Sequence, residues 1–429
     1  MPSPSPSPSP NPSARAFIVG SHSTAFGRFP DRGFPDLTRE AALGALADAG
    51  GLDGGAVGSA WFGNVLMGFS GQHSTRGQFC LAPLVEEGAL RRRLAVWNVE
   101  SGCATGSMAL HGAMRDVLCG AADISLALGV EKTFRPDATP AENLAMFSAG
   151  ENALAPGRTV AEYEKLAAQA GRPLTFGPDR TMFMDTYAMQ AAWHMKVHGT
   201  TRRQIAAAAA KSHCNGALNP LAQYRFEMTT DQVLEDREVS WPLTRAMCAP
   251  VGDGAAAALV CSEAALAALP AAVRARAVEI RAAVLVSGAY RAPGEPSLAR
   301  EAADRAYRLA GLGPQDVDLA ELHDATAFGE LYNCEMMRFC PIGEGGAFVG
   351  AGATALDGAL PVNTSGGLIS KGHPVGASGL SMTHEIVVQL RGEAGARQVR
   401  GARVGAVENG GGIMGLEEAA CAVTLLAAR

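Results

Sequence analysis

Glu100-Ser101-Gly102-Cys103-Ala104-Thr105-Gly106 places one cysteine on a glycine-flanked turn, directly before a run typical of an apolar helix. Free backbone N–H groups and the helix dipole at such a helix start favour the thiolate form of a cysteine. Much later in the chain, Lys371-Gly372-His373-Pro374-Val375-Gly376-Ala377-Ser378-Gly379 holds a histidine on a tight Gly-x-Pro turn. Together the two stretches predict a nucleophile, Cys103, and its general base, His373.

The chain contains an internal repeat. Leu37-Thr38-Arg39-Glu40-Ala41-Ala42 returns as Leu298-Ala299-Arg300-Glu301-Ala302-Ala303, and each copy runs through Ala-Gly into an apolar strand. The cysteine turn and the histidine turn are also each followed by a helix and then a strand. The pattern predicts an α/β fold in two halves, each of which contributes one catalytic turn to a shared cleft.

Two further motifs, Glu321-Leu322-His323-Asp324 and Glu408-Asn409-Gly410-Gly411-Gly412, complete a set that resembles the active-site loops of thiolases. The His-Asp pair resembles the branch of sterol carrier protein X and the bacterial lipid-transfer thiolases, since other thiolases carry Asn-Glu there. Further segments fit that branch in the same order: Tyr187-Ala188, His198-Gly199-Thr200-Thr201, Asn219-Pro220-Leu221-Ala222-Gln223, Pro242-Leu243-Thr244 and Asp253-Gly254-Ala255-Ala256-Ala257. The resemblance implies duplicated thiolase-like α/β halves in five layers, αβαβα.

The domain organisation expected from the pattern and the resemblance has three parts. Residues 1–15 form a disordered Pro/Ser tail without the apolar stretch of a signal peptide. Residues 16–265 form an N-terminal half that includes a mainly helical insertion at about 131–241, and residues 275–429 form a C-terminal half. In thiolases the insertion covers the acyl-CoA. Its Met182-Phe183-Met184 cluster fits either that role or simple core packing.

Composition narrows the range of partners. The net charge of −6 and the lack of a long basic run argue against nucleic acid. The nine cysteines are scattered without a Cys-x-x-Cys pair, which argues against a disulfide framework or a structural metal site and favours the cytoplasm. No apolar run reaches the ~18 residues of a membrane span.

The resemblance also implies roles for the site residues. Cys103 would carry the acyl group, and His373 would take its proton and help to hold the enolate or thioester oxygen. His323, at the end of a predicted strand, would complete the first oxyanion hole, and the backbone N–H groups of Cys103 and Gly410 would form the second. Each has a plainer alternative: an inert buried cysteine, structural histidines and an ordinary glycine turn.

The sequence departs from the family at the second acid/base. Most thiolases place a cysteine two residues before the glycine that matches Gly410, and the sterol carrier branch places one just after His-Asp. Here these positions are Glu408 and Ala325. Glu408 is the natural substitute, because burial raises the pKa of a carboxyl towards the working pH. The alternatives are that Glu408 only binds backbone groups or that His323 shuttles the proton.

The predicted function is thiolytic cleavage of a 3-ketoacyl-CoA, or the reverse Claisen condensation, through an acyl-cysteine. Coenzyme A would be a substrate, no cofactor would be permanently bound, and the chain would form a homodimer or tetramer. Two alternatives stay open: a retro-aldolase acting on a 3-hydroxyacyl-CoA, and an acyl-CoA or lipid carrier without turnover. The segment 325–330 resembles the benzoylsuccinyl-CoA thiolase group, which implies a companion protein with an OB fold and a zinc ribbon.

Overall fold

A computed structural model describes residues 15–147, 153–177 and 179–429. All of the predicted tail except Arg15 therefore lies outside the described residues. Nine strands form one mixed sheet in the order β3-β2-β4-β7-β1-β8-β11-β10-β9. Their bounds are β1 Ala16–Ser23, β2 Ser59–Gly63, β3 Ala95–Val99, β4 Ile124–Glu131, β7 Gly254–Ser262, β8 Val278–Ser287, β9 Leu319–Leu322, β10 Val404–Gly411 and β11 Ala420–Ala428.

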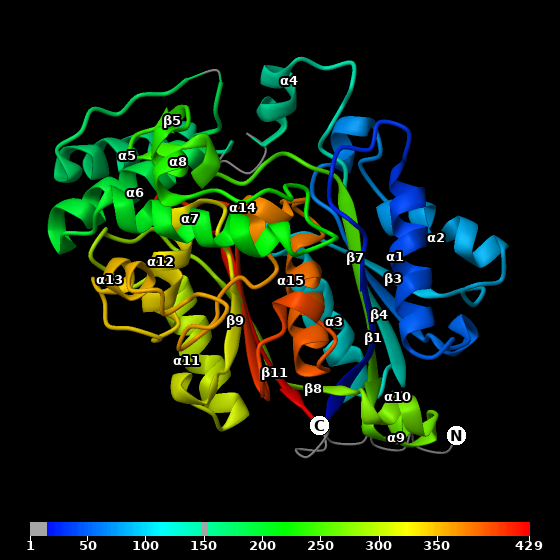
Figure 1. Cartoon of the computed structure of the whole chain (residues 1–429). Coiled ribbons are helices and arrows are strands. Elements are labelled where there is room, and N and C mark those ends of the chain that lie inside the picture. Colours follow the sequence, from blue (N-terminus) through cyan, green and yellow to red (C-terminus); the bar gives the residue numbers. More distant parts are fainter. Residues whose placement is uncertain (1–14, 148–152, 178) are drawn as a thin grey trace, which may run out of the picture.

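One pair of strands joins the two halves into a single sheet. Ala16–Ile18 of β1 pair antiparallel with Val278–Ile280 of β8, and elsewhere each strand pairs within its own half. The two halves of the sheet face each other across a layer of helices, as Figure 1 shows. The pairing of β1 with β8 thus links two halves that the sequence predicts as separate units.

The helices form three layers around these strands, which confirms the five-layer prediction (Figure 1). α1 (Phe34–Asp48) and α2 (Arg76–Glu86) cover the outer face of the N-terminal half, while α11 (Leu298–Ala310) and α12 (Ala327–Met336) cover that of the C-terminal half. α3 (Thr105–Leu118) and α15 (Ser378–Leu390) lie between the halves. The repeated sequence explains the outer pair, because its small residues Ala41, Ala42, Ala302 and Ala303 are fully buried against the strands.

Glycines bring the two catalytic turns together at the start of α3 and α15. A Cβ atom on Gly106 would lie 2.8 Å from the backbone nitrogen of Leu380, and one on Gly379 would lie 2.3 Å from Ser107 Oγ. Only residues without a side chain allow this approach. The glycines that flank the catalytic residues in the sequence are therefore needed for contact between the two central helices.

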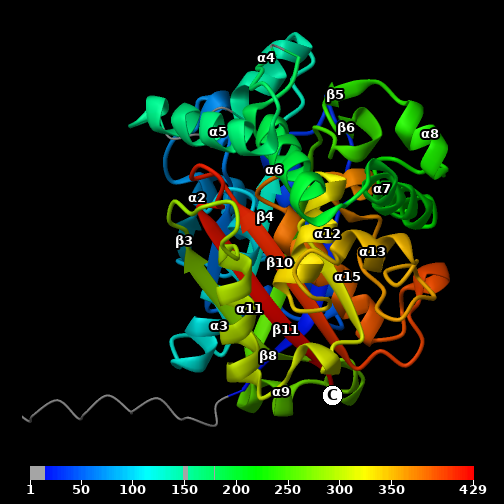
Figure 2. The same cartoon turned by 90° about the vertical axis from the view of Figure 1, so that its left-hand side faces the viewer.

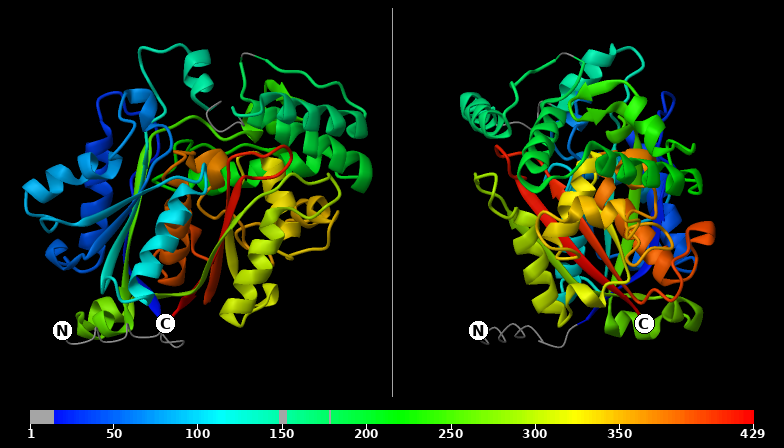
Figure 3. Two further views of the ribbon diagram at one scale, coloured as in Figure 1. Left: turned by 180° about the vertical axis from the view of Figure 1, so that it is seen from behind. Right: turned by 60° about the vertical axis from the view of Figure 1, so that its left-hand side comes forward.

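A largely helical segment covers the end of the sheet at which the catalytic turns lie (Figures 2 and 3). It contains α4 Pro140–Ala145, α5 Pro156–Ala170, α6 Met182–His198, α7 Arg202–Ala217, α8 Thr230–Glu235 and the hairpin of β5 Glu238–Ser240 and β6 Leu243–Thr244. The remaining helices are α9 Glu263–Ala268, α10 Ala271–Ala275, α13 Gly345–Gly350 and α14 Gly367–Lys371. Within the described ranges, no helix combines the length and apolar character that a membrane span requires.

Candidate active site

Cys103 lies on a turn that joins β3 to the first residue of α3, Thr105. Thr105 Oγ1 donates a hydrogen bond to the Gly102 carbonyl (2.6 Å) and accepts one from the Ser101 N–H (2.8 Å), which fixes the turn. Gly102 has φ +55°, and a Cβ atom there would lie 2.4 Å from the Gly412 nitrogen. The turn thus packs directly against the backbone that follows β10.

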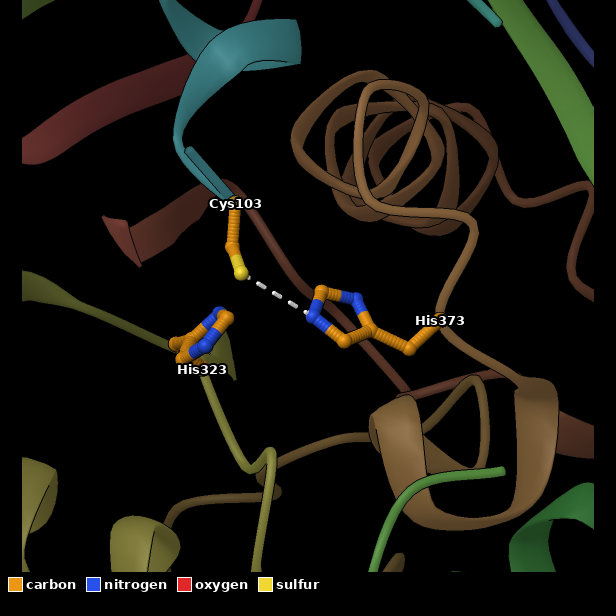
Figure 4. Close-up of side chains that lie close together, drawn as sticks. All are labelled: Cys103, His323 and His373. Carbon is orange, nitrogen blue, oxygen red and sulfur yellow. Dashed lines mark hydrogen bonds between the residues drawn. The ribbon is translucent and has the colours of Figure 1, made fainter. Parts of the chain in front are cut away.

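His373 is oriented by Ser378. The Ser378 hydroxyl donates to the Pro374 carbonyl (3.0 Å), so the same oxygen accepts from His373 Nδ1–H at 2.7 Å. This arrangement leaves Nε2 unprotonated, and Nε2 lies 3.2 Å from Cys103 Sγ (Figure 4). The tautomer is the one that a base for the Cys103 proton needs.

His323 has the opposite tautomer. It follows the last residue of β9, and its Nδ1 accepts a hydrogen bond from Asn409 Nδ2 at 3.2 Å. Asn409 is held in that orientation because its Oδ1 accepts from Ser107 Oγ at 2.9 Å. Nε2 of His323 therefore carries the hydrogen and is a donor, as an oxyanion site requires.

The three side chains converge. Donor atoms of Cys103, His323 and His373 all lie within 4.8 Å of one another, and the imidazole rings are T-shaped with centroids 5.3 Å apart (Figure 4). One thiol and two imidazoles could also bind a borderline-soft metal ion such as Zn²⁺. The hydrogen bond within the group, however, joins the thiol to the basic nitrogen of His373 at 3.2 Å.

Burial determines the protonation of this pair. It raises the pKa of the Cys103 thiol to about 12, although hydrogen bonds from the Gly412 and Cys103 backbone N–H groups lower that pKa in part. Burial, with the nearby His323 and Lys371, holds the pKa of His373 well below its usual range. The helix start favours the thiolate, as predicted, but burial opposes it more strongly, so the shifts of both pKa values favour the neutral thiol and the neutral imidazole.

The Gly410 prediction needs correction. Gly410 belongs to β10, pairs with Cys421 of β11, and does not line the cavity, whereas Gly411 and Gly412 do. The N–H that reaches the Cys103 sulfur is that of Gly412, just beyond the strand. The sequence suggests a loop from Glu408 onward, but the strand continues through Gly411, which keeps Gly410 within the sheet.

Glu408 also differs from its predicted place. It is fully buried and does not line the cavity; its Oε2 accepts from the His323 backbone N–H (3.0 Å) and from Asn333 Nδ2 (2.7 Å). Burial raises its pKa to about 7. Direct proton exchange between Glu408 and substrate is therefore contradicted, and the carboxyl instead holds the backbone at His323.

A cavity of about 410 Å³ opens onto the catalytic group. Apolar side chains from the helical segment dominate its wall, among them Phe147, Phe183 and Met184, while Met182 packs in the core of that segment. Ala325 lines the cavity without a thiol. Four arginines also contribute to its wall: Arg28, Arg180, Arg237 and Arg245.

Sequence reasoning gave no role to four kinds of site residue. Ser378 and Asn409, which set the two tautomers, lie inside the motifs that contain the predicted catalytic residues. That position was the signal in the sequence that could have indicated their roles. Tyr187 and the cavity arginines lie in segments whose inward face has no clear period in the sequence. The positions of Tyr187, Arg180 and Arg237 depend on how the helical segment packs over the sheet.

Family models match most of the chain. The thiolase N-terminal domain matches residues 16–239, and the thiolase C-terminal domain-like model matches residues 292–423. An acetyl-CoA acetyltransferase of Methanothermobacter thermautotrophicus is 35% identical over 404 residues, 93% of this chain and 96% of that protein. Sterol carrier protein 2 of Bos taurus is 34% identical over 95% of this chain and 73% of its own length. Benzoylsuccinyl-CoA thiolase subunit BbsB of Thauera aromatica is 32% identical over 90% of this chain and 91% of that protein.

Solved structures share the fold. A structure titled Ltp2-ChsH2(DUF35) aldolase has a TM-score of 0.75 at 23% identity, over 97% of this chain and 98% of that chain. Human mitochondrial 3-ketoacyl-CoA thiolase in complex with CoA has a TM-score of 0.65 at 19% identity, over 97% of this chain and 98% of that chain. Together with the family models and the curated relatives, these matches show that the chain belongs to the thiolase family and is a thiolase-type acyltransferase.

Proposed function

We propose that this thiolase transfers acyl groups to and from coenzyme A through an acyl-Cys103 intermediate, with His373 as the base. The observation that carries the proposal is the 3.2 Å contact between Cys103 Sγ and the unprotonated Nε2 of His373. An inert buried cysteine has no need of a histidine whose other nitrogen is fixed by a serine. Proton transfer within this pair supplies the thiolate when substrate binds.

In the first half-reaction His373 Nε2 takes the Cys103 proton while the sulfur attacks C3 of a 3-ketoacyl-CoA. The C2–C3 bond breaks, the shortened acyl group stays on the sulfur, and the acetyl-CoA enolate takes a proton at C2 from a second acid. In the second half-reaction the same group, now deprotonated, takes the proton of the CoA thiol. The CoA sulfur then attacks the acyl group. Cys103 leaves and recovers its proton from His373, and the same steps in reverse are a Claisen condensation.

The surrounding donors fit the oxygens that become negative in these steps. The His323 Nε2–H and the newly protonated His373 would hold the enolate oxygen. The backbone N–H groups of Cys103 and Gly412, which meet at the sulfur, would hold the oxygen of the acyl-cysteine. Donors fixed before reaction stabilise such charge most effectively.

The proposed reaction is tested by supplying 3-ketoacyl-CoAs of different chain length and branching, with and without free CoA. We expect loss of the ketoacyl-CoA only when CoA is present, with two acyl-CoA products in equal amounts. Cleavage of a 3-hydroxyacyl-CoA to a carbonyl compound without free CoA would contradict the proposal and favour the aldolase. Tight binding without any cleavage would favour the carrier.

We also propose that the cavity arginines bind the phosphates of CoA. Arg237 and Arg245 are exposed at the cavity, and Arg28 stacks on Phe134, another lining residue. The change Arg237→Ala is expected to raise the KM for CoA about tenfold while leaving kcat within about twofold, since one charge-assisted contact to a phosphate is lost and the Cys103–His373 pair is unchanged. With pantetheine, which lacks these phosphates, the same variant should match the wild type; an equal loss with both thiols would contradict the assignment.

We propose that the chain pairs with a second copy of itself and with a companion of the OB-fold, zinc-ribbon type. Support for self-pairing comes from β3, an edge strand whose Trp97 is 54% exposed. Support for the companion comes from the segment Ala325–Glu330 and from the Ltp2-ChsH2(DUF35) structure. We expect affinity purification of the tagged chain from its own cells, followed by native mass spectrometry, to give a complex containing a small zinc protein. Recovery of copies of this chain alone would contradict the companion.

The nine cysteines all carry free thiols in the structure, which supports a reducing, cytoplasmic location as part of this proposal.

A further inference from the structure

A buried carboxyl pair lies behind the catalytic cavity. Donor atoms of Glu408, Glu418 and Cys421 all lie within 4.8 Å of one another. Cys421 Sγ donates to Glu408 Oε1 at 3.4 Å, and the other Glu408 oxygen holds the His323 backbone. Two carboxylates this close in a buried site repel each other, so the pair keeps at least one proton at neutral pH.

Gly410 makes room for this pair. A Cβ atom on Gly410 would lie 1.8 Å from Glu418 Oε1, so any side chain at this position would displace the carboxyl. Gly410 and Glu408 are two residues apart on β10 and therefore face the same side of the sheet. The absence of a side chain at 410 thus leaves room for the carboxyl of Glu418 next to Glu408. Glu408 itself occupies the position at which most thiolases carry a catalytic cysteine.

A small chamber beside Glu418 is lined by apolar side chains and by a few polar ones. Its volume is about 30 Å³, enough for one water molecule, and its wall includes Glu418, Ser297 and Tyr332. Glu418 Oε2 is buried and has no hydrogen-bond partner among the described residues, and the buried Ser297 Oγ and Tyr332 OH have none apart from each other. Buried polar atoms of this kind are normally satisfied, which indicates bound water in the chamber.

Tyr187 connects the two spaces. Its side chain lines the small chamber together with Glu418, and it also lines the large cavity together with Cys103, His323 and His373. Among the described residues, no other ionisable side chain lines both the small chamber and the large cavity. A proton on Glu418 therefore has a route of three transfers to the bound substrate: to water, to the Tyr187 hydroxyl and to the substrate itself.

We propose that Tyr187, supplied by the Glu408–Glu418 pair through the chamber, is the second acid/base of this thiolase, in place of the missing second cysteine. The proposal rests on the proposed function and assigns the acid that the acyl-Cys103 mechanism requires. As the C2–C3 bond breaks, the Tyr187 hydroxyl gives its proton to C2 of the enolate and takes one from the carboxyl pair through the water. When CoA attacks, its thiol proton returns along the same route, so each turnover leaves the pair unchanged.

The protonation of these groups agrees with the route. Burial, with the charges of Glu418, Cys103 and Glu408 nearby, raises the pKa of Tyr187 well above its usual range and keeps the hydroxyl protonated. Burial raises the pKa of Glu418 well above that of an ordinary carboxyl, and Glu408 adds to the effect. The raised pKa of Glu418 therefore keeps a proton on the Glu408–Glu418 pair at a pH at which the lowered pKa of His373 keeps that imidazole neutral.

Two half-reactions separate this role from a structural one. Exchange of the acetyl-CoA methyl protons with D₂O requires the second acid/base, whereas alkylation of Cys103 by iodoacetamide requires only the Cys103–His373 pair. In Tyr187→Phe and Glu418→Gln we expect proton exchange to fall about 100-fold, the usual range for loss of a general acid or base. The rate of Cys103 alkylation should stay within about threefold of the wild type.

The outcomes are distinct. Tyr307→Phe is the matched control, since Tyr307 is a buried tyrosine on α11 whose hydroxyl donates to the Met337 carbonyl, away from the cavity; it should keep both rates. If both variants keep proton exchange, or if exchange and alkylation fall together, the relay is overturned. A wild-type protein without any exchange, by contrast, would contradict the proposed thiolase reaction itself.

Discussion

Cys103→Ala is expected to reduce CoA-dependent cleavage of a 3-ketoacyl-CoA by at least about 10⁴-fold, because the group that would carry the acyl intermediate is gone. Cys103→Ser should be nearly as inactive. A hydroxyl is a far weaker acid than a thiol, so the imidazole at 3.2 Å cannot generate enough alkoxide to replace the thiolate. Steady-state rates with the preferred substrate measure both losses.

Binding should survive in the same variants. The cavity wall is built from apolar side chains and arginines that neither substitution changes, so the Kd for an acyl-CoA should stay within a few-fold of the wild type. Cys119→Ala is the matched control, because Cys119 is an exposed cysteine at the end of α3 and should keep full activity. Substantial turnover in Cys103→Ala would show that the chemistry does not pass through this sulfur.

The second large effect is expected for His373→Ala. Removing the base that faces the thiol should slow Cys103 alkylation at neutral pH by about 10²- to 10³-fold, the range for a lost general base. Alkylation then depends on the small thiolate fraction of a thiol whose pKa is raised by burial. Below that pKa the thiolate fraction rises about tenfold per pH unit, so the variant should gain activity steeply with pH, whereas the wild type should show a much weaker dependence.

His384→Gln serves as its control. His384 is a half-buried histidine on α15 whose Nδ1 lies 2.9 Å from Ser21 Oγ, outside the catalytic cavity, so alkylation of Cys103 should not change. Equal alkylation rates in His373→Ala and the wild type would show that the thiol is activated without the imidazole, contrary to the proposed role of His373.

The repeated sequence predicted the two α/β halves, and the family resemblance added the five layers. The alanines shared by the two copies occupy the buried faces of α1 and α11, and the glycines of the two catalytic turns allow α3 and α15 to meet. Local sequence carries this information because small residues and tight turns are required wherever backbones approach closely. The pairing of β1 with β8 has no such local signal.

The stretch 408–412 shows where local reasoning fails. Side chains alternate along β10, so Glu408 and Gly410 face Glu418, while Asn409 and Gly411 face the Cys103 turn. The family motif assigned catalytic roles to Glu408 and Gly410, on the assumption that a loop begins there. In the structure β10 continues to Gly411, further than a run of glycines suggests. One unpredicted strand end therefore accounts for both corrections: the N–H at the Cys103 sulfur is that of Gly412, and Glu408 does not line the cavity.

The Cys103 pKa could not be predicted from the sequence either. The helix start lowers a thiol pKa, but the Cys103 turn packs against a segment distant in sequence, the Gly411–Gly412 backbone. Desolvation of the buried thiol outweighs the helix, and only the folded chain brings this segment to the turn.

The most direct test of the central claim is intact-protein mass spectrometry after brief incubation with a panel of acyl-CoAs, with Cys103→Ala alongside. We expect the wild type alone to gain the mass of one acyl group, located on the peptide that contains Cys103. No adduct with any donor that binds tightly would contradict the acyl-Cys103 mechanism.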